Sequence, residues 1–312
     1  MASTRPKLRF AWRRGRSVSP SSALRPTLRQ SARPSSVRLS ELGELGVLAE
    51  LERRGLAEQI EDDAAELEPG LVVTQDSLVE GVHFRLDWLS WRELGFRAAA
   101  VNISDLAASG ARPKALLVSL GLPGETELDD LLALYAGIAE AGVPVRGGDT
   151  TEAGSVFATL TGIGRAERVP GRSGARPGDE LVVTGPLGAA GAAFRERRFV
   201  RPPVRVDEGI ELAREAHAML DLSDGLAADA GHIARRSGCQ LVIELEHVPL
   251  APGATHEDLG FGEDFELLAA TPDPREFTVI GRCEPGSGVE IRLEGRPVAL
   301  SGWEHFRLRE AR

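Results

Sequence analysis

Residues 91–120, WRELGFRAAAVNISDLAASGARPKALLVSL, contain the pattern that decides the fold class of this chain. Residues 91–109 are predicted to form a helix, and Gly110 is the residue type that commonly follows a helix end. The apolar run at 115–120 has the length and composition of a buried strand. Because the helix is followed directly by a buried strand, we expect layered α/β or α+β architecture rather than a bundle or a sandwich.

The same alternation continues along the chain. Further helices are predicted at 40–51, 128–141, 188–194 and 208–218, with one more after Asp224. Strands are predicted at 71–74, 143–146, 155–163, 181–184, 240–244, 265–270, 278–282 and 289–293. The turn-rich segment at 172–179, RSGARPGD, indicates a hinge, and the length of 312 residues suits two domains. We place these domains at 39–166 and 167–312.

Composition limits the class of protein. Cys239 and Cys283 are not in a CxxC-like spacing, so neither a disulfide framework nor a structural zinc site is expected. No apolar run reaches the roughly 20 residues that a membrane helix needs, so we expect a cytoplasmic protein without a membrane partner. Beyond the first 40 positions the chain has 27 basic and 47 acidic residues, a net charge of −20. That charge disfavours nucleic acid as a partner.

Residues 1–38 are predicted to be a disordered basic extension, because they are rich in Arg, Ser and Pro and contain no acidic residue. This composition is also that of a transit peptide, but an unstructured tail or an upstream start codon is the favoured interpretation. A basic arm for nucleic acid has no support beyond Phe10 and Trp12.

Six short acidic segments lie at expected element ends, and all but the first place Asp or Glu beside Gly, Ser or Thr. They are EDDAA (61–65), TQD (74–76), NISD (102–105), GGDT (147–150), DLSDG (221–225) and GEDFE (262–266). Magnesium prefers such hard oxygen ligands, usually a few carboxylates together with water and substrate phosphates. Taken singly, each segment is equally ordinary turn or cap chemistry. Together they allow a multi-metal phosphate site.

Asp105 differs from the other carboxylates because it lies within the apolar pattern of a predicted helix. A carboxylate there either faces solvent or is held by a cation, since an unpaired buried charge is costly. Asp221 and Asp224 lie where a buried strand-like run passes into a helix. They suit either a helix cap or a phosphate site at a helix N-terminus.

The sequence lacks the GxxxxGK[ST] motif and the protein-kinase motifs. A phosphotransferase of this sequence would therefore rely on metal ions and arginine to neutralise phosphate charge. GxSxG, HExxH and a GxGxxG that opens a helix after a strand are also absent.

In their order along the chain, these segments resemble the thiamine-monophosphate kinase family. That family lies in the superfamily of aminoimidazole-ribonucleotide synthetase, selenophosphate synthetase and a hydrogenase maturation protein. The matching stretches span 39–306 and include DDAA (62–65), TQDSLVEGVHF (74–84), VNISDLA (101–107), GGDT (147–150), GRSGARPGD (171–179), DLSDGL (221–226), GEDFEL (262–267) and GWEHF (302–306).

The resemblance implies a two-domain aminoimidazole-ribonucleotide synthetase-like fold. Residues 39–166 would bind ATP and Mg²⁺ and pair through their sheet in a homodimer, with ATP near that interface. Residues 167–312 would form a C-terminal α/β domain that completes the substrate site. The implied ligands of several Mg²⁺ ions are Asp63, Thr74, Gln75, Asp76, Asp105, Asp149, Asp221 and Asp224. The implied ATP contacts are Tyr135, Gly148, Asp149, Arg172 and Ser223, and those to thiamine monophosphate are His83, Glu263 and Trp303.

The implied reaction is ATP-dependent phosphorylation of thiamine monophosphate to thiamine diphosphate. The acceptor is already an ionised phosphate oxygen, so no catalytic base is assigned and direct in-line transfer is expected. The alternatives are a synthetase or kinase of the same superfamily with another acceptor, and a non-catalytic nucleotide-binding relative. The sequence departs from the family pattern at Glu61, Gln75, Phe261 and the short segment at 249–262. These departures concern the specificity for the acceptor.

Overall fold

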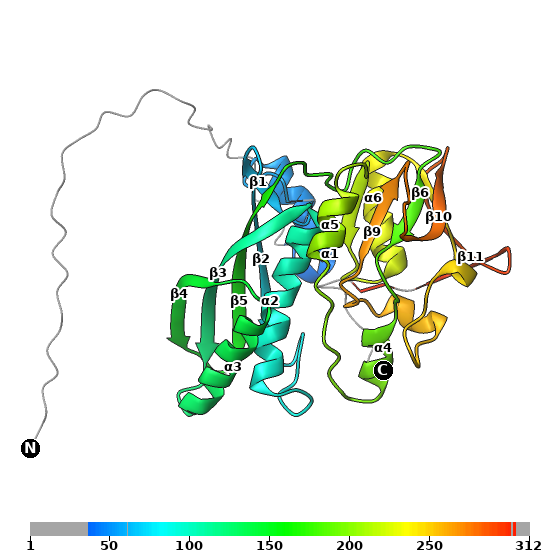
Figure 1. Cartoon of the computed structure of the whole chain (residues 1–312). Helices are drawn as coiled ribbons and strands as arrows, with labels where there is room; N and C mark the ends of the chain where they lie inside the picture. Colours follow the sequence, from blue (N-terminus) through cyan, green and yellow to red (C-terminus); the bar gives the residue numbers. More distant parts are fainter. Residues whose placement is uncertain (1–36, 61, 301, 304–312) are drawn as a thin grey trace, which may run out of the picture. The chain divides into compact units, whose positions relative to one another are not determined.

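The helix predicted at 91–109 is α2 (Trp91–Ala108), and it lies between two β-sheets (Figure 1). The computed structural model describes residues 37–60, 62–300 and 302–303. The described residues from Leu39 onward form one unit that contains both sheets. Every residue of α2 from Leu94 to Ala108 except Asp105 is buried, because the helix packs against a sheet on each side.

The first sheet has five strands in the order β1-β2-β5-β3-β4, in which only β3 and β4 are parallel. Its strands are β1 (Ala65–Glu68), β2 (Leu71–Val79), β3 (Ala111–Leu122), β4 (Val145–Glu152) and β5 (Phe157–Ala166). Helices α2 and α3 (Leu128–Glu140) cover one face through a common apolar core. On β2, Thr74 and Leu78 are buried towards the helices, whereas Gln75 and Ser77 are exposed on the open face.

Two glycines allow α2 and α3 to cross closely. A Cβ at Gly95 would lie 1.9 Å from the carbonyl oxygen of Leu134, and one at Gly137 would lie 1.8 Å from that of Arg92. A side chain at either position would therefore push the helices apart. The capping box of Ser90 and Glu93 fixes where α2 begins.

The second sheet has seven strands in the order β12-β11-β8-β10-β6-β9-β7. Its strands are β6 (Glu180–Val183), β7 (Ala218–Asp221), β8 (Gln240–Glu244), β9 (Leu267–Thr271), β10 (Thr278–Glu284), β11 (Gly288–Leu293) and β12 (Arg296–Val298). Helix α6 (Leu226–Ser237) packs on one face, and α5 (Val206–Leu212) with the end of α2 packs on the other. The remaining elements are α1 (Leu39–Arg53), α4 (Ala189–Arg195) and the 3₁₀ turns η1 (Leu245–His247) and η2 (His256–Gly260).

Most predicted elements are present, and the main difference lies at 208–218. The helix predicted there ends at Leu212, and β7 begins at Ala218 because this strand pairs with β9. Strands β2 and β3 are longer than predicted, and β1 and β12 were not predicted. Across the described ranges, none of the helices has the length and apolarity to cross a membrane. Of the predicted basic extension, only its last two residues lie within the described residues.

Candidate active site

Three carboxylates from separate segments converge where α2 lies between the sheets. Asp63 precedes β1, Asp105 lies in the last turn of α2, and Asp221 ends β7. One oxygen from each of them lies within 4.8 Å of the others. The Asp63 side chain is only 3% exposed, and the whole Asp221 residue is also 3% exposed. We call Asp63, Asp105 and Asp221 the carboxylate centre.

Hydroxyl groups fix two of these carboxylates. Thr74 on β2 donates its hydroxyl hydrogen to Asp105 Oδ2 at 2.5 Å. Ser104 donates to Asp221 Oδ2, also at 2.5 Å. Because Ser104 and Asp105 are neighbours on α2, this one helix joins the first sheet to the second at the carboxylate centre.

Burial and mutual repulsion raise the pKa values of this group. Burial raises the pKa of Asp105 well above its usual value, and the charges of Asp76, Asp221 and Asp63 raise it further. Burial likewise raises the pKa of Asp221 to about 8 and that of Asp76 to about 6, with Asp63 adding to both. Asp76 is held next to the centre by the amide oxygen of Asn102, which accepts its backbone N–H at 3.2 Å.

Arg172 supplies positive charge to one member of the centre. Its Nε and Nη2 donate to Asp63 Oδ1 at 3.1 and 2.5 Å, and its backbone N–H donates to Asp62 Oδ1 at 2.8 Å. Within the described ranges, neither Asp105 nor Asp221 has an ion-pair partner. The centre therefore has hard oxygen donors and too little positive charge, which is the donor chemistry that suits Mg²⁺.

Asp224 belongs to a second group of ligand atoms, with Asp229 and His232 on α6. One atom from each of the three lies within 4.8 Å of the others. Asp229 Oδ2 accepts the backbone N–H groups of Asp224 and Gly225, each at 3.0 Å, and so stabilises the turn that starts α6. Burial lowers the pKa of His232 to about 4, and the nearby Arg172 adds to this effect. His232 is therefore neutral at physiological pH.

Glu263 lies in a tight turn held against the Asp221–Gly225 loop. Gly262 and Glu263 have φ values of 85° and 60°, and Glu263 N–H donates to the carbonyl oxygen of Ser223 at 2.8 Å. A Cβ at Gly262 would lie 2.2 Å from that oxygen, so only glycine fits. The Glu263 carboxylate pairs with Arg97 of α2. Burial raises the pKa of Glu263, and Arg97 opposes that rise.

The other two predicted acceptor residues lie on different segments. Trp303 donates its backbone N–H to the carbonyl oxygen of Asp224 at 2.8 Å, which places it beside the same loop as Glu263. His83 follows β2, and its Nδ1 accepts the backbone N–H of Val79 at 3.0 Å. This bond fixes the orientation of the His83 ring. Glu61 and the residues after Trp303 in the GWEHF stretch lie outside the described residues.

Four further predicted residues, all in the first sheet or on its helix α3, lie away from the carboxylate centre. Gln75 is on the open face of the first sheet, where its side-chain oxygen accepts from the Thr161 hydroxyl at 3.1 Å. Gly148 and Asp149 are on the edge strand β4, three strand positions from β2. The strand pairs β4–β3, β3–β5 and β5–β2 place Asp149 level with exposed Ser77. Asp149 therefore lies on the same open face as Gln75. Tyr135, on α3, packs against the apolar core of the first sheet.

Two contributors to the site were not singled out from the sequence. Arg97 is the only charged residue in the otherwise uncharged run 94–104, and this isolation was an available signal for a buried ion pair. Its Nε is buried without a hydrogen-bond partner in the described part of the chain. Asp229, the other contributor, resembles any polar residue on an amphipathic helix, so its role at the start of α6 had no sequence signal.

Comparison with known proteins defines the class. Residues 61–166 match the family described as AIR synthase related protein, N-terminal domain, and residues 176–294 match its C-terminal domain. These matches cover most of the chain, which is thus an AIR synthase related protein. Solved structures of the hydrogenase maturation protein HypE share this fold, for example one from E. coli at 22% identity with a TM-score of 0.61.

Within this class, the chain belongs to the thiamine-monophosphate kinase family. It is 34% identical to the thiamine-monophosphate kinase of Aquifex aeolicus, over 86% of this chain and 100% of the relative. The enzyme of Methanopyrus kandleri is 36% identical over 74% of this chain and 84% of the relative. A solved structure of AaThiL complexed with AMPPCP and TMP has 34% identity and a TM-score of 0.80, covering 86% of this chain and 99% of that one.

Proposed function

We propose that this protein phosphorylates thiamine monophosphate to thiamine diphosphate with ATP. The observation that carries the proposal is the carboxylate centre, in a chain whose relatives are thiamine-monophosphate kinases. A relative with an ATP analogue and TMP bound, AaThiL, supports the two substrates. We further propose that the protein is cytoplasmic, with the domains divided as 39–166 and 167–312.

Mg²⁺ is the metal that the carboxylate centre would hold. Asp63, Asp105 and Asp221 would contribute oxygens, with Asp76 and Thr74 next to them, and Asp224 would contribute from the start of α6. When bound, the ions would neutralise the phosphates and align donor with acceptor. The raised pKa of Asp221, about 8, supports this role, because a divalent cation relieves the repulsion that burial strengthens.

The side chains of this protein would position groups rather than transfer protons. The acceptor phosphate is already ionised at neutral pH, so direct in-line transfer needs no strong base. Arg172 would orient Asp63 and contribute positive charge at the phosphates, while Ser223 would contact ATP from the same loop as Asp221. Ser104 and Thr74 would hold Asp221 and Asp105 in one geometry throughout turnover.

The open face of the first sheet supports a homodimer. Leu117 is 37% exposed on that face, and Gln75 and Asp149 are there too. Pairing of two sheets through this face would bury Leu117 and bring Gly148, Asp149 and Gln75 of each chain to an interface. We propose that ATP binds near this interface and that Tyr135, which lies on the covered side of the same sheet, is one of its contacts.

Direct detection of product tests the proposed function. Purified protein is incubated with ATP, Mg²⁺ and thiamine monophosphate, and thiamine diphosphate is measured by chromatography, with Asp105→Asn as the comparison variant. Product that depends on Asp105 supports the proposal, and ADP formation without thiamine diphosphate contradicts it. With a chiral γ-phosphorus, inversion is expected, and retention would mean a phosphoenzyme.

A further inference from the structure

Arg97 is a buried cation on α2, the helix that lies between the two sheets. Only 10% of its side chain is exposed. Its guanidinium pairs with the Glu263 carboxylate, whereas its Nε is buried and has no hydrogen-bond partner in the described ranges. A buried N–H without a partner is costly, so a position that keeps one needs an explanation other than stability.

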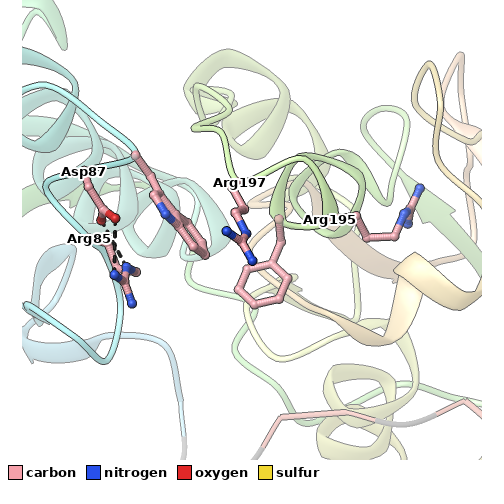
Figure 2. A pocket seen from close by; sticks show the side chains of 6 residues that line it. Arg85, Asp87, Arg195 and Arg197 are labelled. Carbon is pink, nitrogen blue, oxygen red and sulfur yellow. Dashed lines mark hydrogen bonds and ion pairs between the residues drawn. The ribbon is translucent and has the colours of Figure 1, made fainter. Parts of the chain in front are cut away.

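The arginines around the pocket of Trp88 and Phe194, between the loop after β2 and the end of α4, have the opposite surroundings. Figure 2 shows Arg85 bonded there to Asp87, at 3.0 Å, and the two side chains are 59% and 61% exposed. Solvent screens such a pair, so it contributes little. The pair of Arg97 is mostly enclosed, and it joins α2 to the segment that precedes β9.

The turn that Glu263 occupies is joined in its own right to the loop that carries Asp221 and Asp224. Three backbone hydrogen bonds of 2.8–2.9 Å link residues 263–266 to residues 222–223. Asp221 and Asp224 flank the two bonded positions of the loop. A change in the position of the turn would therefore shift both carboxylates relative to α2.

The backbone of this turn needs a contact that holds it. Glu263 has φ 60° and Phe265 has φ 52°, both in the left-handed region that residues other than glycine rarely adopt. Such conformations persist only where surrounding contacts fix them, and they concentrate at functional sites. Arg97 supplies such a contact to the Glu263 side chain.

α2 also holds the loop at a second point, through Ser104. The Ser104 hydroxyl donates to Asp221 Oδ2 at 2.5 Å. Arg97 and Ser104 are separated by about two helical turns, so they lie on the same side of α2. Asp105 is the next residue of this helix. The helix that carries Asp105 therefore sets the position of the facing loop through two side chains.

We infer that Arg97 is a positioning residue of the carboxylate centre. By pairing with Glu263, it holds the loop at 221–224 at the distance from α2 at which Asp105 and Asp221 can bind the same metal ion. The inference rests on the proposed function, because it takes the carboxylate centre to be a metal site. Residues that orient metal ligands without touching the metal commonly change metal affinity 10- to 100-fold.

Metal binding without turnover tests the inference. Mn²⁺, which prefers oxygen ligands as Mg²⁺ does, is titrated into the purified protein, and free Mn²⁺ is measured by electron paramagnetic resonance. We expect Arg97→Met to raise the Kd of Mn²⁺ about tenfold. Loss of a nearby positive charge would by itself lower that Kd, so the two effects have opposite signs. The Arg97→Met/Glu263→Gln variant should recover stability but not Mn²⁺ affinity, since the contact between α2 and the turn is still missing.

Arg92→Met is the matched control, because it removes the same charge from α2 at an exposed ion pair with Glu140 of α3. Its Kd for Mn²⁺ should equal that of the wild type. Equal Kd values for Arg97→Met and the wild type would overturn the inference, and so would a double variant that recovers Mn²⁺ affinity together with stability.

Two further outcomes separate this inference from the proposed function. A wild-type protein that binds no Mn²⁺ would overturn the carboxylate centre as a metal site, and this inference with it. Mn²⁺ binding that is weakened in Arg97→Met, in a protein that forms no thiamine diphosphate, would support the role of Arg97 and overturn only the proposed reaction.

Discussion

The two faces of the five-stranded sheet place similar polar residues in opposite surroundings. On the face that α2 covers, Thr74 is buried and contacts Asp105, and Asp76 lies beside the same carboxylates. On the open face, Gln75 and Asp149 are exposed. Adjacent residues of one motif, TQD at 74–76, are thus divided between the faces, because side chains of a strand alternate.

This difference shows that burial, rather than the motif, decides what a carboxylate does. Covered carboxylates repel one another in a poorly solvated space and need a cation. Those on the open face are hydrated and need no partner within the chain. A metal role for Asp149 therefore depends on a ligand or second subunit that covers the open face, whereas Asp105 is already enclosed.

The largest expected effect comes from the covered face. Asp105→Asn removes a charge that would hold Mg²⁺, so kcat for thiamine diphosphate formation should fall about a thousandfold, equivalent to roughly 4 kcal/mol. The thermal stability of the metal-free variant should rise, because a buried like charge is gone. Steady-state kinetics and thermal unfolding measure the two effects, and an unchanged kcat would contradict the carboxylate centre.

Arg97→Met should have the next largest effect, on stability. It leaves the partly buried Glu263 carboxylate, whose side chain is 30% exposed, without its ion-pair partner, and such a loss costs about 1–3 kcal/mol in the free energy of unfolding. Denaturant unfolding measures the change. The Arg97→Met/Glu263→Gln double variant should recover most of it, since no uncompensated charge remains. Equal destabilisation of the single and double variants would show that the pair is not coupled.

The covered carboxylates also predict a pH dependence of the metal-free protein. A folded-state pKa raised to about 8 for Asp221 and about 6 for Asp76 means that the unfolded chain ionises first as pH rises. The contribution of these groups to stability should therefore be complete below about pH 4 and be lost progressively between about pH 4 and about pH 8. Scanning calorimetry with a chelator measures this loss. Added Mg²⁺ should raise Tm more at about pH 8 than at about pH 5.5, and equal shifts would contradict the assignment.

The smallest effect is expected on the open face. Gln75→Ala removes one hydrogen bond to Thr161 at an exposed position, so stability should change by no more than about 0.5 kcal/mol. The Mg²⁺-dependent rise in Tm of the free chain should be unchanged, in contrast to Asp105→Asn. A smaller Mg²⁺-dependent rise in Tm for Gln75→Ala than for the wild type would show that the open face contributes to the metal site. It would contradict the contrast drawn between the two faces.

Residue periodicity predicted the elements that carry the site. The helix predicted at 91–109 is present as α2, and the change from strand to helix predicted at 221–224 is present as β7 followed by α6. In both segments the local residue pattern favours the same element that the tertiary packing favours. The helix predicted at 208–218 was too long. Pairing of Ala218 with Ala270 on β9 overrode the local helical pattern there, and no local signal reports a partner 52 residues away.

The sequence by itself determined the family, the order of the acidic motifs and the alternation of helices and strands. These depend on residue identity and on local periods, which are read along the chain. Only the tertiary structure decided which acidic residues meet. Asp63, Asp105 and Asp221 converge because α2 is packed between two sheets, whereas Asp149 lies on the far edge of one of them. The pairing of Arg97 with Glu263 and the pocket of Trp88 and Phe194 were decided in the same way. Contacts between distant segments depend on how layers pack, and that packing leaves no periodic signal in the sequence.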